Sequence, residues 1–140
     1  MFRPEITPEV MNQRGIGRLP RKVGVEITSI TAEGVAGRLP VRPDLLAPNG
    51  YLHAASVIAL ADTLAGYGTF ANLPDGAKSF TTIELKSNFI GTARSGVITC
   101  TATPAHLGRT TQIWDAVVSD EAGRKIALFR CTQLILYDKK

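Results

Sequence analysis

The chain has 140 residues, of which 44% are hydrophobic and 20% charged, which is the size and composition of one globular domain with its own core. Sixteen Lys and Arg against twelve Asp and Glu leave a net charge of +4, which favours anionic partners without selecting one. The basic residues form no long run interleaved with aromatics, so we expect no nucleic-acid surface. We expect a single domain over residues 1–140.

The first 20 residues are predicted to form a short helix and a lead-in. Thr7, Pro8 and Glu9 make a helix-start signature, because a hydroxyl caps the free amides, proline suits the first helical position and an acid suits the first turn. Gly15 is placed to end this helix.

Six later segments are rich in β-branched and aromatic residues and are bounded by turn residues, which predicts strands. They are residues 23–30, 35–41, 81–90, 97–103, 110–119 and 125–137. The first two flank a turn at 32–34, which predicts a hairpin, and Pro40 implies a sheet edge or a strand end.

One helix is predicted between the second and third of these strands. It begins at Ala54, after a loop rich in proline and glycine, and extends to about Phe70, with its end expected near Gly66 or Gly68. The order β-β-α-β-β-β-β predicts an α+β fold in which an antiparallel sheet of about six strands packs on one helix.

Asp62 is the one formally charged residue between Leu45 and Pro74. At 100° per residue it points away from the stripe that should face the sheet, which consists of Val57, Leu60, Ala61 and Leu64. Its neighbours on the second face are apolar as well, namely Ala55, Ile58, Ala59, Ala65 and Gly66. A helix that is apolar nearly all round must be covered on both sides, so we expect a second copy of the chain over this face.

Burying an unpaired carboxylate costs several kcal/mol, so Asp62 is expected to be paired, hydrogen-bonded, shifted in pKa or functional. The structural alternative is an acid that caps a neighbouring helix or pairs with an arginine across a dimer. His53 lies nine residues earlier, about 13 Å along the helix and half a turn around it, which disfavours a His-Asp dyad within one chain. The unpaired amides at the helix start can instead stabilise a developing oxyanion.

The remaining chemistry-bearing residues predict neither a metal site nor a membrane span. Cys100 and Cys131 lie in apolar alternating segments and no secretory signal precedes the domain, so we expect buried, reduced thiols and a cytoplasmic protein. Polar residues and glycines interrupt the apolar stretch around Asp62. With His53 and His106 alone and no Cys pair at metal-ligand spacing, no metal is expected.

Four sequence features together resemble the hotdog-fold acyl-CoA thioesterases of the PaaI-like (phenylacetate-degradation) family. They are Asn-Gly-Tyr-Leu-His-Ala-Ala at 49–55, Asp62, Thr-Thr-Ile-Glu-Leu at 81–85 and His-Leu-Gly-Arg at 106–109. The resemblance covers roughly residues 20–137. It implies a long helix wrapped by an antiparallel sheet, and two subunits that join their sheets into one and often pair again into tetramers. It also implies an acyl-CoA substrate and no separate cofactor.

The resemblance assigns catalytic roles residue by residue. Asp62 corresponds to the family's general base or nucleophile, and the Ala54 amide to its oxyanion donor, with His53-Ala54-Ala55 in place of His-Gly-Gly. Alanine keeps the N–H but adds a methyl group where the thioester approaches. Thr82 corresponds to a hydroxyl that orients the attacking water in some members; the alternative is an ordinary strand threonine.

The resemblance also places residues beside the substrate. Asn49, Gly50 and Ala55 belong to the binding motif, while Arg109 and Arg94 are candidates for the coenzyme A phosphates. The alternative for Arg109 is a solvated hairpin charge. His53 either shapes the loop or is simply hydrogen-bonded to backbone. A polar Asn or Gln of the family is replaced here by Ala47, and Trp114 is expected in the core on the same face as Gln112.

Two other functions remain open from the sequence. One is an enoyl-thioester hydratase on the same fold, which would need an acid and a histidine that converge on the substrate. The other is a non-catalytic protein that binds acyl-CoA. The first would consume an enoyl-CoA without releasing thiol, and the second would bind its ligand without turnover.

Overall fold

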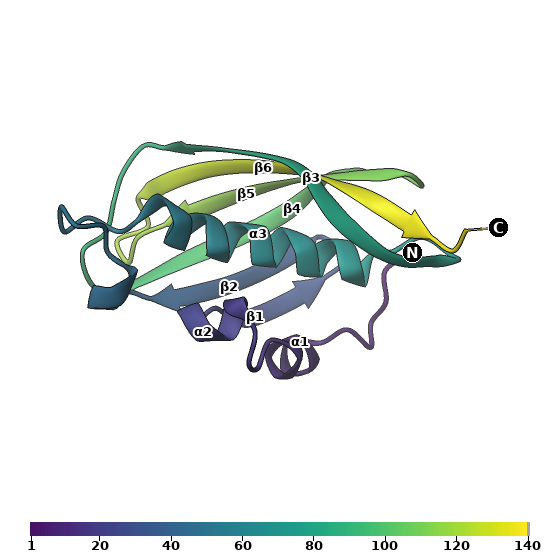
Figure 1. Ribbon diagram of the computed structural model, residues 1–140, viewed down its shortest axis with the longest axis horizontal. Helices are drawn as coiled ribbons and strands as arrows, with labels where there is room; N and C mark the ends of the chain where they lie inside the picture. Colours follow the sequence, from purple (N-terminus) through teal and green to yellow (C-terminus); the bar gives the residue numbers. More distant parts are fainter. Residues whose placement is uncertain (140) are drawn as a thin grey trace.

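A computed structural model describes residues 1–139. One six-stranded antiparallel sheet, in the order β1-β2-β4-β5-β6-β3, curves around a single long helix, α3 (Figure 1). The strands are β1 (Glu26–Thr31), β2 (Gly34–Pro40), β3 (Ala77–Phe89), β4 (Val97–Leu107), β5 (Thr111–Ser119) and β6 (Lys125–Tyr137). The helices are α1 (Pro8–Arg14), α2 (Leu19–Val23) and α3 (Ala54–Ala71), with a 3-10 turn, η1, at Pro43–Leu45. The predicted α+β hotdog fold is confirmed.

The N-terminal helix α1 forms as predicted. The Thr7 hydroxyl accepts a hydrogen bond of 3.3 Å from the Val10 amide, and Gly15 is the C-cap. The second short helix, α2, was not predicted from the sequence, and it shifts the start of the first strand from 23 to Glu26. Five residues are too few to show a helical period, and α2 is held by its packing against α3.

The strands are confirmed, and two of them are longer than the sequence predicted. β3 begins at Ala77 rather than 81 and β4 extends to Leu107 rather than 103. Both extensions are paired along their length, β3 with β6 and β4 with β5, and neighbouring strands supply hydrogen bonds that local propensity does not reveal. The hairpin between β1 and β2 is confirmed, and Pro40 is the last residue of β2.

The predicted end of α3 near Gly66 or Gly68 is wrong, because the helix continues to Ala71. Both glycines are buried and helical, and each lies where another side chain packs closely on the helix. A methyl group on Gly66 would contact the Phe80 ring at 3.3 Å, and one on Gly68 would lie 2.5 Å from the Trp114 ring. These glycines make room for aromatic rings rather than ending the helix.

Gly68→Ala is expected to destabilise the protein by about 1–3 kcal/mol, because the added methyl group overlaps Trp114, which is fully buried. This range is the net effect, because a gain of about 1 kcal/mol in helix propensity offsets part of the cost of the overlap. Urea denaturation followed by tryptophan fluorescence measures the change. Gly66→Ala is the matched control, since its contact at 3.3 Å can relax; an equal or smaller loss for Gly68→Ala would contradict this packing argument.

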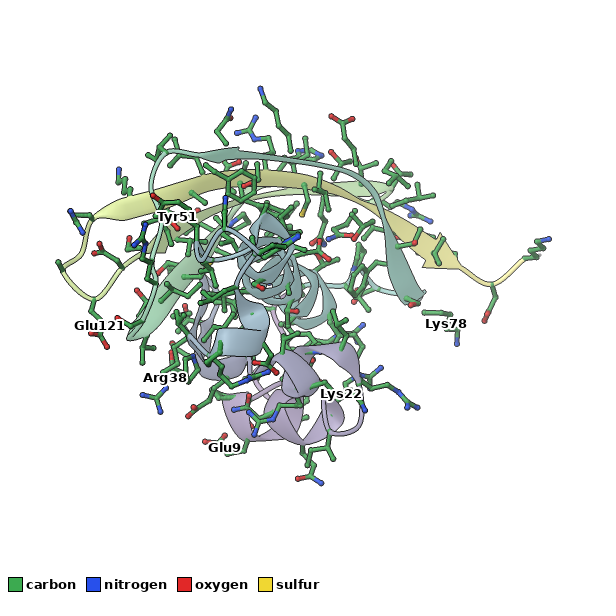
Figure 2. The ribbon with its side chains drawn as sticks, turned by 60° about the vertical axis from the view of Figure 1, so that its left-hand side comes forward. Glu9, Lys22, Arg38, Tyr51, Lys78 and Glu121 are labelled. Atoms are coloured by element: carbon green, nitrogen blue, oxygen red, sulfur yellow. The ribbon has the colours of Figure 1, made fainter. Side chains whose placement is uncertain are left out.

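The stripe predicted to face the sheet is confirmed, since Val57, Leu60, Ala61 and Leu64 are all buried. On its other side α3 is partly covered by its own chain, by α2 and by Phe80 of β3, whereas a second copy was the expected cover. Figure 2 shows the sheet arching over α3 and the two short helices on the side that the sheet leaves open. By length and composition α3 could span a membrane, but more than half of it is buried in the fold, as in a core helix.

The strand β3 forms one free edge of the sheet and is exposed over most of its length. Its exposed apolar side chains include Ile83, Leu85 and Phe89, at 57%, 40% and 45% exposure.

Cys100 and Cys131 are free and buried, and Trp114 lies in the core beside Gln112, all as predicted.

Candidate active site

Asp62 lies at a hollow of about 480 Å³ between α2 and α3. The hollow is lined by Leu19 and Val23 of α2, by Asp44 and Leu45 of η1, and by Ala55, Ser56, Ile58, Ala59, Asp62 and Thr63 of α3. One carboxylate oxygen of Asp62, Oδ1, is buried and has no hydrogen-bond partner within residues 1–139. Burial raises the pKa of this carboxyl above its ordinary value of 3.8. An unpaired acid in a mostly apolar hollow is equipped to take a proton. Within residues 1–139 the Asp62 carboxylate caps no helix, whereas pairing with an arginine of a second copy stays an open alternative.

Because Asp62 is harder to ionise in the folded protein, we expect Asp62→Asn to raise the free energy of unfolding at pH 7. The native state holds the proton more tightly than the unfolded state, so the wild type loses stability as the pH rises from 3.8 through the raised pKa. The extra stability of Asp62→Asn is therefore present at pH values above this range and absent at pH values below it. Thermal melts across pH 3–8 test this expectation; a gain that does not change with pH would contradict it.

The start of α3 is built around His53. Its ring Nδ1 accepts a hydrogen bond of 2.9 Å from the Ala55 amide, and its own amide donates to the Leu45 carbonyl at 3.1 Å. The Ser56 hydroxyl donates to the same carbonyl at 2.8 Å. The His53 side chain therefore caps the helix by accepting a hydrogen bond from a backbone amide. This agrees with a role in positioning the helix start rather than a contact with substrate.

Capping leaves the amide of Ala54 available. Within residues 1–139 the Ala54 N–H has no hydrogen-bond acceptor, and Ala54 is exposed at the first position of α3. Such an amide carries the partial positive charge of the helix start. It is placed to donate a hydrogen bond to an oxyanion that approaches from outside the chain.

The loop before α3 is a tight turn. Gly50 has a positive φ of 84°, its amide donates to the Ala47 carbonyl at 2.8 Å, and the Asn49 side chain accepts from the Tyr51 amide at 3.2 Å. Asn49 and Gly50 therefore shape the turn that leads into the helix. Arg94 lies over the Tyr51 ring at 4.3 Å, so this cation is held at the same end of the molecule as the Ala54 amide.

Arg109 lies at the other end of the molecule. Its guanidinium is 5.7 Å from the Tyr137 ring, and its carbonyl accepts a hydrogen bond of 2.7 Å from the Tyr137 hydroxyl. It borders a hollow that Asn72, the C-cap of α3, also lines. The 18 residues of α3 span about 27 Å, so within one chain Arg109 and the Ala54 amide do not act on the same ligand atom.

Ala54 and Asp62 are also separated within one chain. Eight residues of helix place them about 12 Å apart along the axis, which is too far for both to contact one thioester carbonyl. The two groups can meet only if a second copy of the chain supplies one of them.

Thr82, on the edge strand β3, donates its hydroxyl proton to the Gln133 side-chain oxygen at 2.8 Å. Gln133 is fully buried, and its amide nitrogen lies 3.4 Å from the Cys131 sulfur. Burial, with the Asp62 carboxylate as a further cause, raises the pKa of the Cys131 thiol to about 12. Sequence reasoning missed Gln133, although the alternation of β6 places this polar residue on the same face as Phe129, Cys131 and Ile135, which was a detectable signal.

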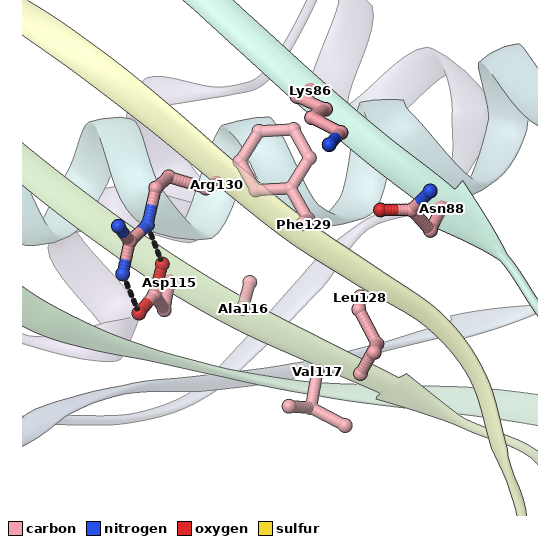
Figure 3. Close-up of a pocket in the computed structure, with 8 residues that line it drawn as sticks. All are labelled: Lys86, Asn88, Asp115, Ala116, Val117, Leu128, Phe129 and Arg130. Atoms are coloured by element: carbon pink, nitrogen blue, oxygen red, sulfur yellow. Dashed lines mark hydrogen bonds and ion pairs between the residues drawn. The ribbon is translucent and has the colours of Figure 1, made fainter.

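A separate hollow of about 390 Å³ lies on the face of the sheet away from α3 and holds none of the predicted catalytic residues (Figure 3). Asp115 and Arg130, direct partners on β5 and β6, form an ion pair at one side of it, with a second hydrogen bond of 2.7 Å. Hydrogen bonding by Arg130 lowers the pKa of Asp115. Both groups are thus satisfied by each other, unlike Asp62. Within residues 1–139 no three His, Cys, Asp or Glu side chains are grouped to hold a metal ion.

The family model of the thioesterase superfamily matches residues 49–127, which include the helix start, Asp62 and Thr82. The chain belongs to the thioesterase superfamily. Among curated relatives, a putative esterase ComA2 of Bacillus subtilis is 32% identical over 81% of this chain and 90% of its own length. A 1,4-dihydroxy-2-naphthoyl-CoA hydrolase of Listeria monocytogenes is 28% identical over 87% of this chain and 98% of its own.

Solved thioesterase structures have the same architecture. A mutant form of thioesterase PA1618 from Pseudomonas aeruginosa superposes with a TM-score of 0.91 and 25% identity, covering 96% of this chain and 97% of that one. PaaI of Escherichia coli, at 21% identity and a TM-score of 0.76, covers 84% of this chain and 83% of that one and shows the shared fold. The resemblance to PaaI-like hotdog thioesterases is confirmed.

Proposed function

We propose that this thioesterase-superfamily chain hydrolyses an acyl-CoA thioester to a free acid and coenzyme A. The observation that carries the proposal is the unpaired, half-buried Asp62 carboxylate on a helix whose first amide, that of Ala54, is also unpaired. A base and an oxyanion donor are the two groups that attack of water on a thioester requires. The relative from Listeria, named as a hydrolase of an aryl-CoA, supports the choice of substrate class and brings aryl groups into the test panel.

In the proposed reaction Asp62 takes a proton from water while the water oxygen bonds to the thioester carbonyl carbon. The negative charge that develops on the carbonyl oxygen is stabilised by the Ala54 N–H. The carbon–sulfur bond then breaks, and the coenzyme A thiolate recovers the proton from Asp62. A raised pKa suits Asp62 to this exchange, since a general base is most effective when its pKa is near the ambient pH.

We propose that the working unit contains two copies of the chain, because Ala54 and Asp62 of one copy lie about 12 Å apart along α3. The edge strand β3 is the surface proposed for pairing: it is long, it has a free edge, and it exposes Ile83, Leu85 and Phe89. Pairing two such edges would extend the sheet across both subunits. A dimer and a dimer of dimers both satisfy this proposal.

The oligomeric state is measured by sedimentation velocity. We expect at least twice the mass of one chain for the wild type, and a shift toward monomer for Leu85→Lys, which adds a charge to the proposed interface. Leu107→Lys, at an exposed leucine of similar accessibility on β4, is the matched control and should leave the assembly intact. A monomeric wild type would contradict the shared site.

Release of free thiol, followed with a chromogenic disulfide reagent, tests the activity. The panel contains aryl-, short-chain and medium-chain acyl-CoAs, and the preferred acyl group is the one with the highest kcat/KM. An enoyl-CoA that is consumed without thiol release would favour a hydratase instead. Tight binding with no turnover of any substrate would favour a non-catalytic binding protein.

We also propose a cytoplasmic location for the protein.

A further inference from the structure

A buried glutamine lies behind the proposed site and is bonded to one of its hydroxyl groups. Gln133 is 0% exposed, and its side-chain oxygen accepts the Thr82 hydroxyl proton at 2.8 Å. The other end of the same amide faces the Cys131 sulfur at 3.4 Å, which fixes its direction. Since a hydroxyl group has one proton, Thr82 has none left to donate and presents only lone pairs to a third group.

The register of α3 and β3 places Thr82 at the level of Asp62 along the helix. The strand returns alongside the helix in the opposite direction: Phe80 contacts the helix at Gly66, while Ala93, beyond the strand, bonds to Leu52 just before the helix. Asp62 is one turn before Gly66, about 6 Å along the helix, and Thr82 is two residues after Phe80, about 6.6 Å along the strand. Both steps run in the same direction, so the two side chains lie at the same level of the molecule.

Three further facts agree with this placement. Thr82 lies on the face of β3 that pairs with the buried face of β6, where Cys131 and Gln133 lie. The Asp62 carboxylate contributes, after burial, to the raised pKa of the Cys131 thiol. Thr82 itself is exposed, so its oxygen can be reached by a water molecule.

We infer that Gln133 is a positioning residue for hydrolysis: by taking the Thr82 proton it makes Thr82 a hydrogen-bond acceptor for the attacking water. The water then donates one hydrogen to Thr82 and the other to Asp62, and its lone pair is directed at the thioester carbon. This inference rests on the proposed hydrolase activity. Ala47 stands where the family has a polar Asn or Gln, and the inference gives Thr82 as a polar group that can hold the water in this chain.

Steady-state kinetics of four variants test the inference, with the acyl-CoA that the wild type hydrolyses best. Thr82→Val and Gln133→Met are each expected to lower kcat about tenfold, with KM changed less than about threefold. Thr82→Val removes the acceptor of the water's hydrogen bond, and Gln133→Met frees the Thr82 proton, so that the hydroxyl is no longer held as an acceptor. In the double variant we expect no loss beyond that of Thr82→Val, since Gln133 acts through that hydroxyl. Gln133→Glu keeps an acceptor for Thr82 and should retain most of the activity.

The matched control is Gln112→Met. Gln112 is also buried and lies directly opposite Gln133 in the sheet, but it is bonded to Trp114 and to the Asn72 carbonyl instead. The substitution Gln112→Met should lower the stability of the protein without lowering kcat.

An equal fall in kcat for Gln112→Met, a further fall in the double variant, or unchanged kcat in a folded Gln133→Met protein would each overturn the inference. If Gln133→Met does not fold, Thr82→Val and Gln133→Glu still decide it, since full activity of the first or inactivity of the second overturns it. No thiol release by the wild type would instead overturn the proposed function.

Discussion

Asp62→Asn is expected to lower kcat for acyl-CoA hydrolysis by about 10²- to 10⁴-fold, the range typical of losing a general base. Asparagine has nearly the same shape but accepts no proton at neutral pH, so the fold and KM should change little. Thiol release during the first turnover and in the steady state separates slow chemistry from slow product release. A loss below tenfold would sink the assignment of Asp62 as the base.

Asp44→Asn is the matched control, because Asp44 is a second carboxylate lining the same hollow. Its carboxylate is paired with Arg42 at 2.9 Å, and the hydrogen bond from Arg42 lowers its pKa. It is exposed, ionised and already satisfied, so we expect kcat within about twofold of the wild type. The acid limb of the wild-type pH profile should report a group whose pKa lies above 3.8, and this limb should be absent from the residual activity of Asp62→Asn.

Ala54→Pro is expected to lower kcat by about 10²- to 10³-fold, because it removes the one N–H proposed to hold the oxyanion. The substitution suits this position structurally. Ala54 is the first residue of α3, where proline is favoured, and His53 before it already has the extended backbone that precedes proline, with φ −65° and ψ 138°. Circular dichroism and a thermal melt should therefore show an intact helix. Activity within tenfold of the wild type would remove the Ala54 amide from the mechanism.

Ala54→Gly is the control for this experiment, since glycine keeps the N–H and removes the methyl group. We expect kcat to be retained and KM to be equal or lower, because the approach to the amide is less crowded. A loss as large as that of Ala54→Pro would show that the side chain, rather than the amide, matters at this position.

The two inactive variants also test whether the site is shared between subunits. In a dimer that joins Asp62→Asn to Ala54→Pro, one site receives both defects and the other receives none. Equal, freely exchanged mixtures should then recover about a quarter of the wild-type activity. A mixture that stays inactive, with exchange of subunits confirmed, would place both groups in one chain.

The elements with strong local signals were predictable from the sequence. The hairpin, the last strand and the capped helix α1 each carry a periodic pattern or an end signal within a few residues. The ends of α3, β3 and β4 were not, because their residues are held by rings or strands that are distant along the chain. Gly66 and Gly68 are the clearest case: the residue type that often ends a helix here lies within it, under Phe80 and Trp114.

For the site, the sequence by itself determined that Asp62 is an isolated acid on an apolar helix and that His53 and Ala54 begin that helix. Spacing along one helix decides both facts, and the 3.6-residue period suffices to read them. Only the tertiary structure decided that Asp62 Oδ1 has no partner, that His53 caps Ala55 and leaves the Ala54 amide unpaired, and that Gln133 takes the Thr82 proton. Hydrogen bonds between side chains 51 residues apart depend on strand register, which long-range pairing sets and local sequence does not.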